Sequence, residues 1–114
     1  MYDTYTLAQE IADILDEKKA ENIVVLDIRR LSVLADYFVI ASGRSEIQVN
    51  ALHEELSKRL SARGINPLHL DQSKRWVVLD YGDIIVHVFH HEERSFYNLE
   101  RLWADAEQMS STTK

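Results

Sequence analysis

His87, His90 and His91 are the side chains in this sequence best suited to bind a metal ion. Their spacing argues against it, because the adjacent His90 and His91 point in different directions if the chain is extended there. The chain contains no cysteine, and the other neighbouring side chains that could bind a metal are Glu92 and Glu93. Structural zinc sites need four ligands that converge. The sequence therefore predicts no metal site and assigns these histidines to structure.

A second candidate is the turn Gly43-Arg44-Ser45, which follows an apolar run and precedes a helical pattern. Backbone amides in this geometry can hold a phosphate, and a Gly-Ser turn is typical of nucleotidyltransferases. Those enzymes also need two acidic residues, two positions apart on the next strand, to hold magnesium. The next strand here offers Asp80 and Asp83, which are three apart across a turn. Nucleotidyl transfer is therefore disfavoured and kept as the alternative.

No serine or threonine nucleophile has a recognisable general base at a useful spacing. Asp27 and Asp36 stand at the edges of predicted strands, where aspartates more often cap or form turns. We therefore predict no catalytic residues, no enzyme activity and no cofactor.

The segment 76–103 gathers aromatic and charged side chains around a tight turn and includes both tryptophans. Any one of its aromatic residues alone is more often a core residue. Their grouping favours recognition, because Trp, Tyr and Arg are enriched at binding hot spots, where truncation costs ~2 kcal/mol or more. The acidic members of the segment would form a rim suited to a basic partner. These aromatic and acidic residues are Trp76, Tyr81, Tyr97, Trp103, Asp80, Asp83 and Glu100.

Hydrophobic periodicity and turn residues indicate the elements that position this segment. Thr6 with Gln9, and Ser45 with Gln48, can form capping boxes at two helix starts, and Gly64 can end the second helix. In chain order the sequence predicts a helix ending near 18–19, strands at 23–28 and 37–41, a helix over 45–64, a surface loop over 66–75, a hairpin of 76–79 with 84–89, and a helix over 98–108.

This order, αββαββα, predicts an α/β (α+β) sandwich with one mixed sheet of four to five strands covered by helices. We expect one domain over residues 1–109 and a frayed tail over 110–114. The hairpin alternates apolar residues on both of its sides, so some apolar sheet surface should be left for a partner.

Composition narrows the range of partners. The chain has 114 residues, 46% of them hydrophobic, and a net charge of −6. This charge disfavours nucleic-acid binding, which depends on Lys and Arg, and favours encounter with a basic protein. No apolar run approaches the ~20 residues that span a bilayer, and the first residues are acidic rather than basic as in a targeting peptide. We expect a soluble, cytoplasmic protein without a membrane partner.

Three segments resemble the Iojap-related ribosomal silencing factor family. They are VVLDIRRLSVLADYFVIASGRSEIQV at 24–49, WVVLDYGDIIVHVF at 76–89 and RSFYNLERLW at 94–103. The resemblance covers nearly the whole chain. One departure is the loop at 68–75, where family members commonly carry a Glu-Gly pair and a slightly longer run.

The resemblance implies a fold related to nucleotidyltransferases without their activity. It also implies binding to ribosomal protein fourteen of the large ribosomal subunit, which would block joining of the small subunit and reduce translation when nutrients are scarce. Carried over by position, the partner-binding residues are Trp76, Asp80, Tyr81, Asp83, Arg94, Tyr97 and Glu100. A homodimeric interaction module, paired through the sheet or hairpin, is a further alternative.

Overall fold

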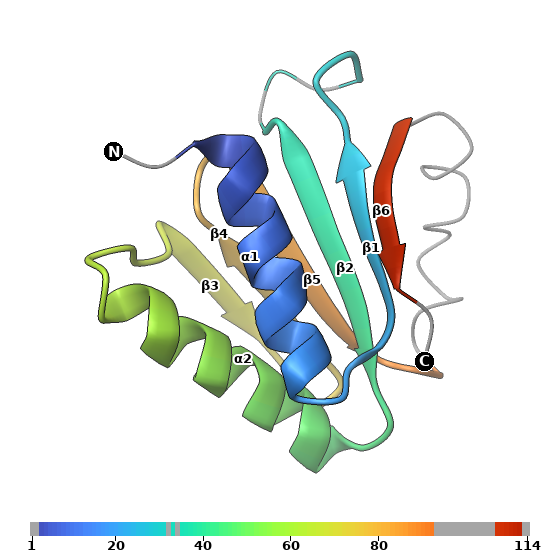
Figure 1. The fold of residues 1–114 in the computed structure, drawn as a ribbon. Coiled ribbons are helices and arrows are strands. Elements are labelled where there is room, and N and C mark those ends of the chain that lie inside the picture. The colour runs from blue at the N-terminus through green and yellow to red at the C-terminus, as the bar shows by residue number, and fades with distance from the viewer. Residues whose placement is uncertain (1–2, 32, 34, 93–106, 113–114) are drawn as a thin grey trace.

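The computed structural model describes residues 3–31, 33, 35–92 and 107–112, the last range by its backbone alone. Figure 1 shows the arrangement of its helices and strands. The elements are α1 (Thr4–Glu17), β1 (Glu21–Asp27), β2 (Tyr37–Gly43), α2 (Glu46–Ser61), β3 (His69–Gln72), β4 (Trp76–Asp80), β5 (Ile84–His90) and β6 (Glu107–Thr112).

The strands form one mixed sheet in the order β3-β4-β5-β2-β1-β6. Its centre is a parallel pairing of β2 with β5, from Tyr37 opposite Ile84 to Gly43 opposite His90. The other four pairings are antiparallel. The predicted mixed α+β fold is therefore confirmed, and the predicted hairpin of β4 and β5 is present. The sheet has six strands among the described residues, more than the four to five predicted.

Side-chain caps begin both helices. The second behaves as predicted, because the Ser45 hydroxyl accepts a hydrogen bond from the Gln48 amide at 3.0 Å. The first begins earlier than predicted: Asp3, not Thr6, is its cap, and its carboxylate accepts from the Thr6 amide at 3.0 Å. An aspartate outside the apolar period was the better cap because its charge also suits the positive end of the helix dipole.

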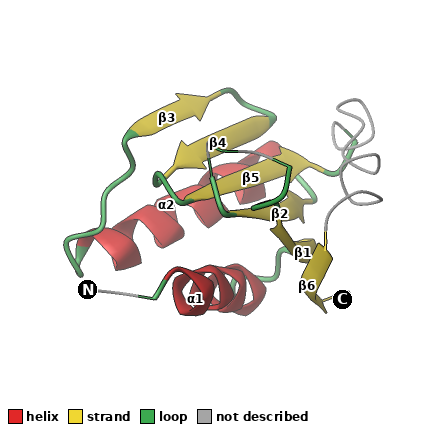
Figure 2. Cartoon of the chain, turned by 90° about the horizontal axis from the view of Figure 1, so that it is seen from above, coloured by secondary structure: helices red, strands yellow, loops and turns green. Residues whose placement is uncertain are grey.

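Both helices lie on the same face of the sheet (Figure 2). The main core fills the space between them and that face, and it includes Leu7, Ile11, Leu52, Leu56 and Leu79. A second, smaller apolar cluster lies on the opposite face and is built from residues of β1, β2, β4 and β5. The sheet is therefore apolar on both faces, and neither described helix covers the second one. Neither helix is long and apolar enough to cross a membrane.

Three segments differ from the sequence prediction. The predicted loop over 66–75 contains strand β3, which pairs with β4 in full register. Its four side chains are all exposed, so the sequence lacks the alternation of apolar and polar residues that would predict a strand there. The predicted helix over 98–108 falls mostly outside the described residues, but Glu107 and Gln108 belong to strand β6. The predicted frayed tail also differs, since Ser110, Ser111 and Thr112 pair with β1, whose free edge supplies hydrogen-bond partners.

Gly43 is needed where β2 passes under the start of α2. A methyl group added there would lie 3.0 Å from Val49 Cγ2 and 3.1 Å from the Val49 backbone nitrogen.

We expect Gly43→Ala to lower the free energy of unfolding by about 1–3 kcal/mol, because backbone atoms cannot move aside as a side chain can. Urea unfolding measures it. The control is Gly64→Asn, which keeps a residue tolerant of the positive φ of 77° and adds no contact. Equal stability of Gly43→Ala and the parent would contradict this role.

Candidate functional site

The face of the sheet opposite the helices carries a band of aromatic side chains. We call it the open face because neither α1 nor α2 covers it, although its Phe89 is only 4% exposed. Residues of β2, β4 and β5 reach it at every second position, as strand geometry requires. The ring centroids of Trp76 and Phe89 are 6.4 Å apart, and the His87 ring stacks on Phe89 at 5.9 Å. Phe38 follows at 4.7 Å from His87. Four rings from three strands therefore form a continuous row.

His87 sits inside this row without a hydrogen-bond partner for its Nε2 atom among the described residues. Removal from water disfavours the charged imidazolium, and burial lowers the pKa of His87 to about 4. At neutral pH the ring is therefore uncharged and behaves as one more aromatic surface. The sequence prediction that this histidine is structural agrees with that position.

The turn between β4 and β5 places acidic side chains at one end of the open face. The Asp80 carboxylate accepts a hydrogen bond from the Gly82 amide at 2.8 Å, and Gly82 has a φ of 91°. The Asp83 side chain is exposed, while its carbonyl accepts from the Asp36 and Tyr37 amides at 2.8 and 3.1 Å. Asp80 therefore shapes the turn, and Asp83 anchors the turn against β2 and also presents a carboxylate to solvent.

The structure brings some of the predicted partner-binding residues together. Trp76 and Asp80 lie on the open face at the two ends of β4, and Asp83 lies just beyond it. Tyr81 points to the opposite side, where it is buried in the main core and burial raises the pKa of its hydroxyl. Tyr81 therefore has a structural position. The other three predicted residues, Arg94, Tyr97 and Glu100, lie outside the described residues.

Arg75 is a residue that the sequence analysis did not select. Its guanidinium contacts Glu92 at 2.8 Å, Glu46 at 3.5 Å and the His90 Nδ1 atom at 3.3 Å. The Glu92 amide also donates to His90 Nδ1, at 3.2 Å. The Arg75 guanidinium holds the pKa of the Glu92 carboxyl below its usual value. This cluster joins the start of β4 and the end of β5 to the start of α2, beside Trp76.

The turn at Gly43 uses its own amides. The Arg44 amide donates to Gln48 Oε1 at 2.6 Å, and the Gln48 amide donates to the Ser45 hydroxyl. Arg44 itself pairs with Glu21 at 2.6 Å. Two of the donors that would hold a phosphate are therefore engaged within the chain. In the described part of the chain, no group of three or more His, Asp or Glu side chains is arranged to hold a metal ion.

The fold and this site define an α+β protein that presents an aromatic and acidic sheet face. Residues 2–114 match the family described as "Ribosomal silencing factor during starvation", and the chain belongs to this family. Ribosomal silencing factor RsfS of Halalkalibacterium halodurans is 46% identical over 102 residues, which cover 88% of this chain and 87% of that protein. Chloroplastic protein Iojap of maize is 31% identical over 89% of this chain and 45% of its own length.

A solved structure supports the same assignment. A crystal structure of a protein from Bacillus halodurans superimposes with a TM-score of 0.78 at 43% identity, covering 88% of this chain and 95% of that one. The resemblance to the Iojap-related family is therefore confirmed. The family is described by ribosome silencing and not by a catalytic reaction.

His87 makes a pH dependence of stability testable. Between about pH 6.5 and the folded-state pKa of about 4, the unfolded chain binds a proton at this ring that the folded chain does not. The contribution of His87 to stability is therefore complete above about pH 6.5 and falls by up to about 3 kcal/mol as the pH drops to 4. Urea unfolding of His87→Phe should show a shallower acid loss than the parent.

The control for this measurement is His91→Gln, which changes an exposed histidine immediately after the end of β5. Its acid loss should be steeper than that of His87→Phe. Identical acid profiles for His87→Phe and the parent would mean that His87 titrates normally in the folded protein.

Proposed function

We propose that this protein silences ribosomes by binding the large ribosomal subunit through its ribosomal protein fourteen. Docked there, the domain would occupy space that the small subunit needs, and so reduce translation when nutrients are limiting. The family match over residues 2–114 is the observation that carries this proposal. The relative from Halalkalibacterium halodurans, named a ribosomal silencing factor, supports it.

The proposed docking surface is the open face with its acidic end. Trp76 supplies a large partly buried ring at the beginning of β4, and Asp80 and Asp83 supply carboxylates at the end. A basic ribosomal protein would meet both apolar contact and complementary charge, the combination found at well-packed interface centres and rims. We include Arg94, Tyr97 and Glu100 by their positions in the family pattern, and Tyr81 as the buried support of the turn.

The proposed mechanism is steric. A domain that blocks subunit joining needs only a stable interface, which for protein complexes buries roughly 1,600 Å² in total, and a position that the second subunit must otherwise occupy. We propose no catalysis and no cofactor. Because ribosomes are the proposed target, we place the activity in the cytoplasm. The protein would regulate translation only by occupying the site that the small subunit needs.

Nucleotide binding at the Gly43 turn is the alternative function. Its support is the strand-turn-helix arrangement there, which faces backbone amides outward at a helix start. Against it, the amide of Arg44 is already bonded to Gln48. Calorimetry with a nucleoside triphosphate and magnesium distinguishes the two, because ribosome docking needs no such binding. Light scattering of the free protein tests the other alternative, a homodimer.

Trp76→Ala tests the docking surface. We expect it to weaken co-sedimentation with isolated large subunits by about thirtyfold, the equivalent of a hot-spot loss of about 2 kcal/mol, and to restore joining of the two subunits. The ring packs against the smaller apolar cluster and is not part of the main core, so we expect the variant to fold with reduced stability. Circular dichroism confirms that before binding is measured.

The matched control is Tyr5→Ala, which removes another partly exposed ring from α1 on the helix side. It should bind large subunits like the parent, and neither protein should co-sediment with small subunits. If Trp76→Ala retained full anti-association activity, the open face would not be the docking surface.

A further inference from the structure

Strand β3 lies at the edge of the sheet, so one side of its backbone faces no other strand in the part of the chain that the structure describes. The Ser73 amide donates to the Trp76 carbonyl at 2.8 Å, which fixes the first hydrogen-bonded pair of the β3–β4 ladder. Antiparallel pairs alternate between bonded and non-bonded, so Asp71 directs its backbone groups toward β4. At the beginning of the strand the Leu68 amide donates to the Asp80 carbonyl at 2.7 Å. Leu70 and Gln72 therefore direct their amides and carbonyls outward, away from β4. These four groups form a free sheet edge.

Two leucines are exposed along this edge, among the polar side chains of His69, Asp71 and Gln72. All four residues of β3 are exposed, Leu70 to 48%, and the preceding Leu68 is exposed to 69%. Sheet edges are commonly protected by lysine or proline, because free backbone groups beside apolar side chains invite another strand. β3 itself contains neither residue. Its chemistry is that of an edge that accepts a partner.

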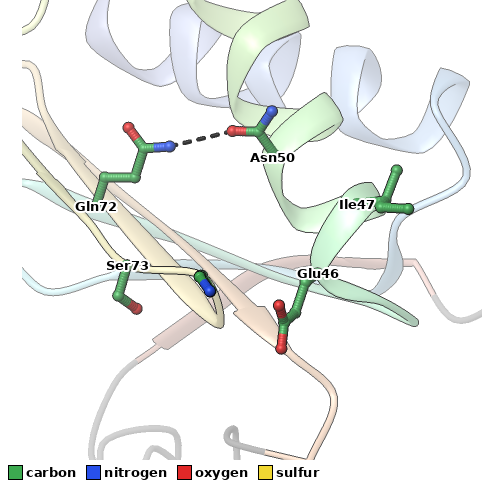
Figure 3. Close-up of a pocket in the computed structure, with 6 residues that line it drawn as sticks. Glu46, Ile47, Asn50, Gln72 and Ser73 are labelled. Carbon is green, nitrogen blue, oxygen red and sulfur yellow. Dashed lines mark hydrogen bonds between the residues drawn. The ribbon is translucent and has the colours of Figure 1, made fainter.

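A groove runs beside this edge on the helix side. It has a volume of about 550 Å³ and lies between the start of α2 and the β3–β4 turn. Figure 3 shows Gln72 reaching across to Asn50, with Ile47 projecting from α2. The Gln72 side-chain amide donates to Asn50 Oδ1 at 3.1 Å and so links β3 to α2. Ile47 is 83% exposed. Every second side chain of a strand added to β3 would point toward this groove.

Charge selects what can occupy the edge. Asp71 stands opposite Val78 on the open face, and Asp80 is its diagonal neighbour there, about 7 Å away by strand geometry. A second copy that used all four outward groups would pair Leu70 with Gln72 and oppose Asp71 to Asp71. Like charges directly opposite destabilise a strand pair. A strand with lysine or arginine opposite Asp71 is favoured instead.

We propose that β3 binds an extended segment of another protein by strand addition, with apolar side chains beside Leu70 and a lysine or arginine beside Asp71. Backbone hydrogen bonds at Leu70 and Gln72 would hold the segment, and alternate side chains would set its specificity, as in other complexes formed at sheet edges. This interaction is separate from the proposed docking of Trp76 on the ribosome.

The probe is a fluorescent peptide of alternating valine and lysine, about seven residues long, measured by fluorescence anisotropy against the full chain. We expect saturable binding. The same peptide with methylated alternate amide nitrogens should bind at least tenfold more weakly, because it cannot pair with the edge. A peptide with glutamate in place of lysine should also bind at least tenfold more weakly.

Leu70→Pro removes the outward amide without touching a β3–β4 hydrogen bond, so proline is tolerated at this edge position. We expect at least a tenfold loss of peptide binding, with thermal unfolding and co-sedimentation with large subunits near those of the parent. Asp71→Lys should reverse the preference between the lysine and glutamate peptides. Asp13→Lys, an equal charge change at an exposed position of α1, should leave the preference unchanged.

Three results would overturn the proposal. They are absence of saturable binding of the lysine peptide, equal binding of the methylated peptide, and a self-association that Leu70→Pro abolishes, which would assign the edge to a second copy. The effect of Trp76→Ala on ribosome binding tests only the docking role proposed for the open face. The two proposals therefore fail separately.

Discussion

The parallel pairing of β2 with β5 is the constraint on which the rest of this fold depends. It joins two antiparallel units, one built on β1 and β2 and the other on β4 and β5, into a single sheet. Parallel neighbours need a long crossover, and here α2, β3 and β4 all lie between the two strands in the chain. Central strands of this kind are apolar on both sides. An apolar second face therefore follows from the topology itself.

That second face explains how an aromatic row and an uncharged histidine come to share one surface. The helices and the main core use alternate residues of β2, β4 and β5, so the intervening residues must lie opposite. His87 is one of them, between Phe38 and Phe89. A charged ring in that position would lose hydration without gaining a partner. The same desolvation that lowers its pKa makes it compatible with an apolar row.

The sequence predicted those features that local chemistry determines. The cap at Ser45, the hairpin from Trp76 to His90 and the alternation of its side chains all depend on residues close in the chain. β3 and β6 could not be found that way, because β3 is exposed on every residue and β6 is defined by pairing with distant β1. Tyr81 was chosen for its residue type, but only the strand register decides which face it occupies.

The free edge and the open face meet at β3 and β4, so their charges act together. Asp71 and Asp80 are neighbours on that face. At physiological salt, charges repel one another effectively over distances up to ~8 Å. A carboxylate on an incoming strand would add a third negative charge within that distance. An exposed ion pair contributes only about 0–1 kcal/mol, so the two carboxylates add little affinity for a basic strand. Affinity at this edge must come from backbone hydrogen bonds and apolar contact. The acidic residues act by disfavouring wrong strands, including a second copy of β3, which is how repulsion produces specificity.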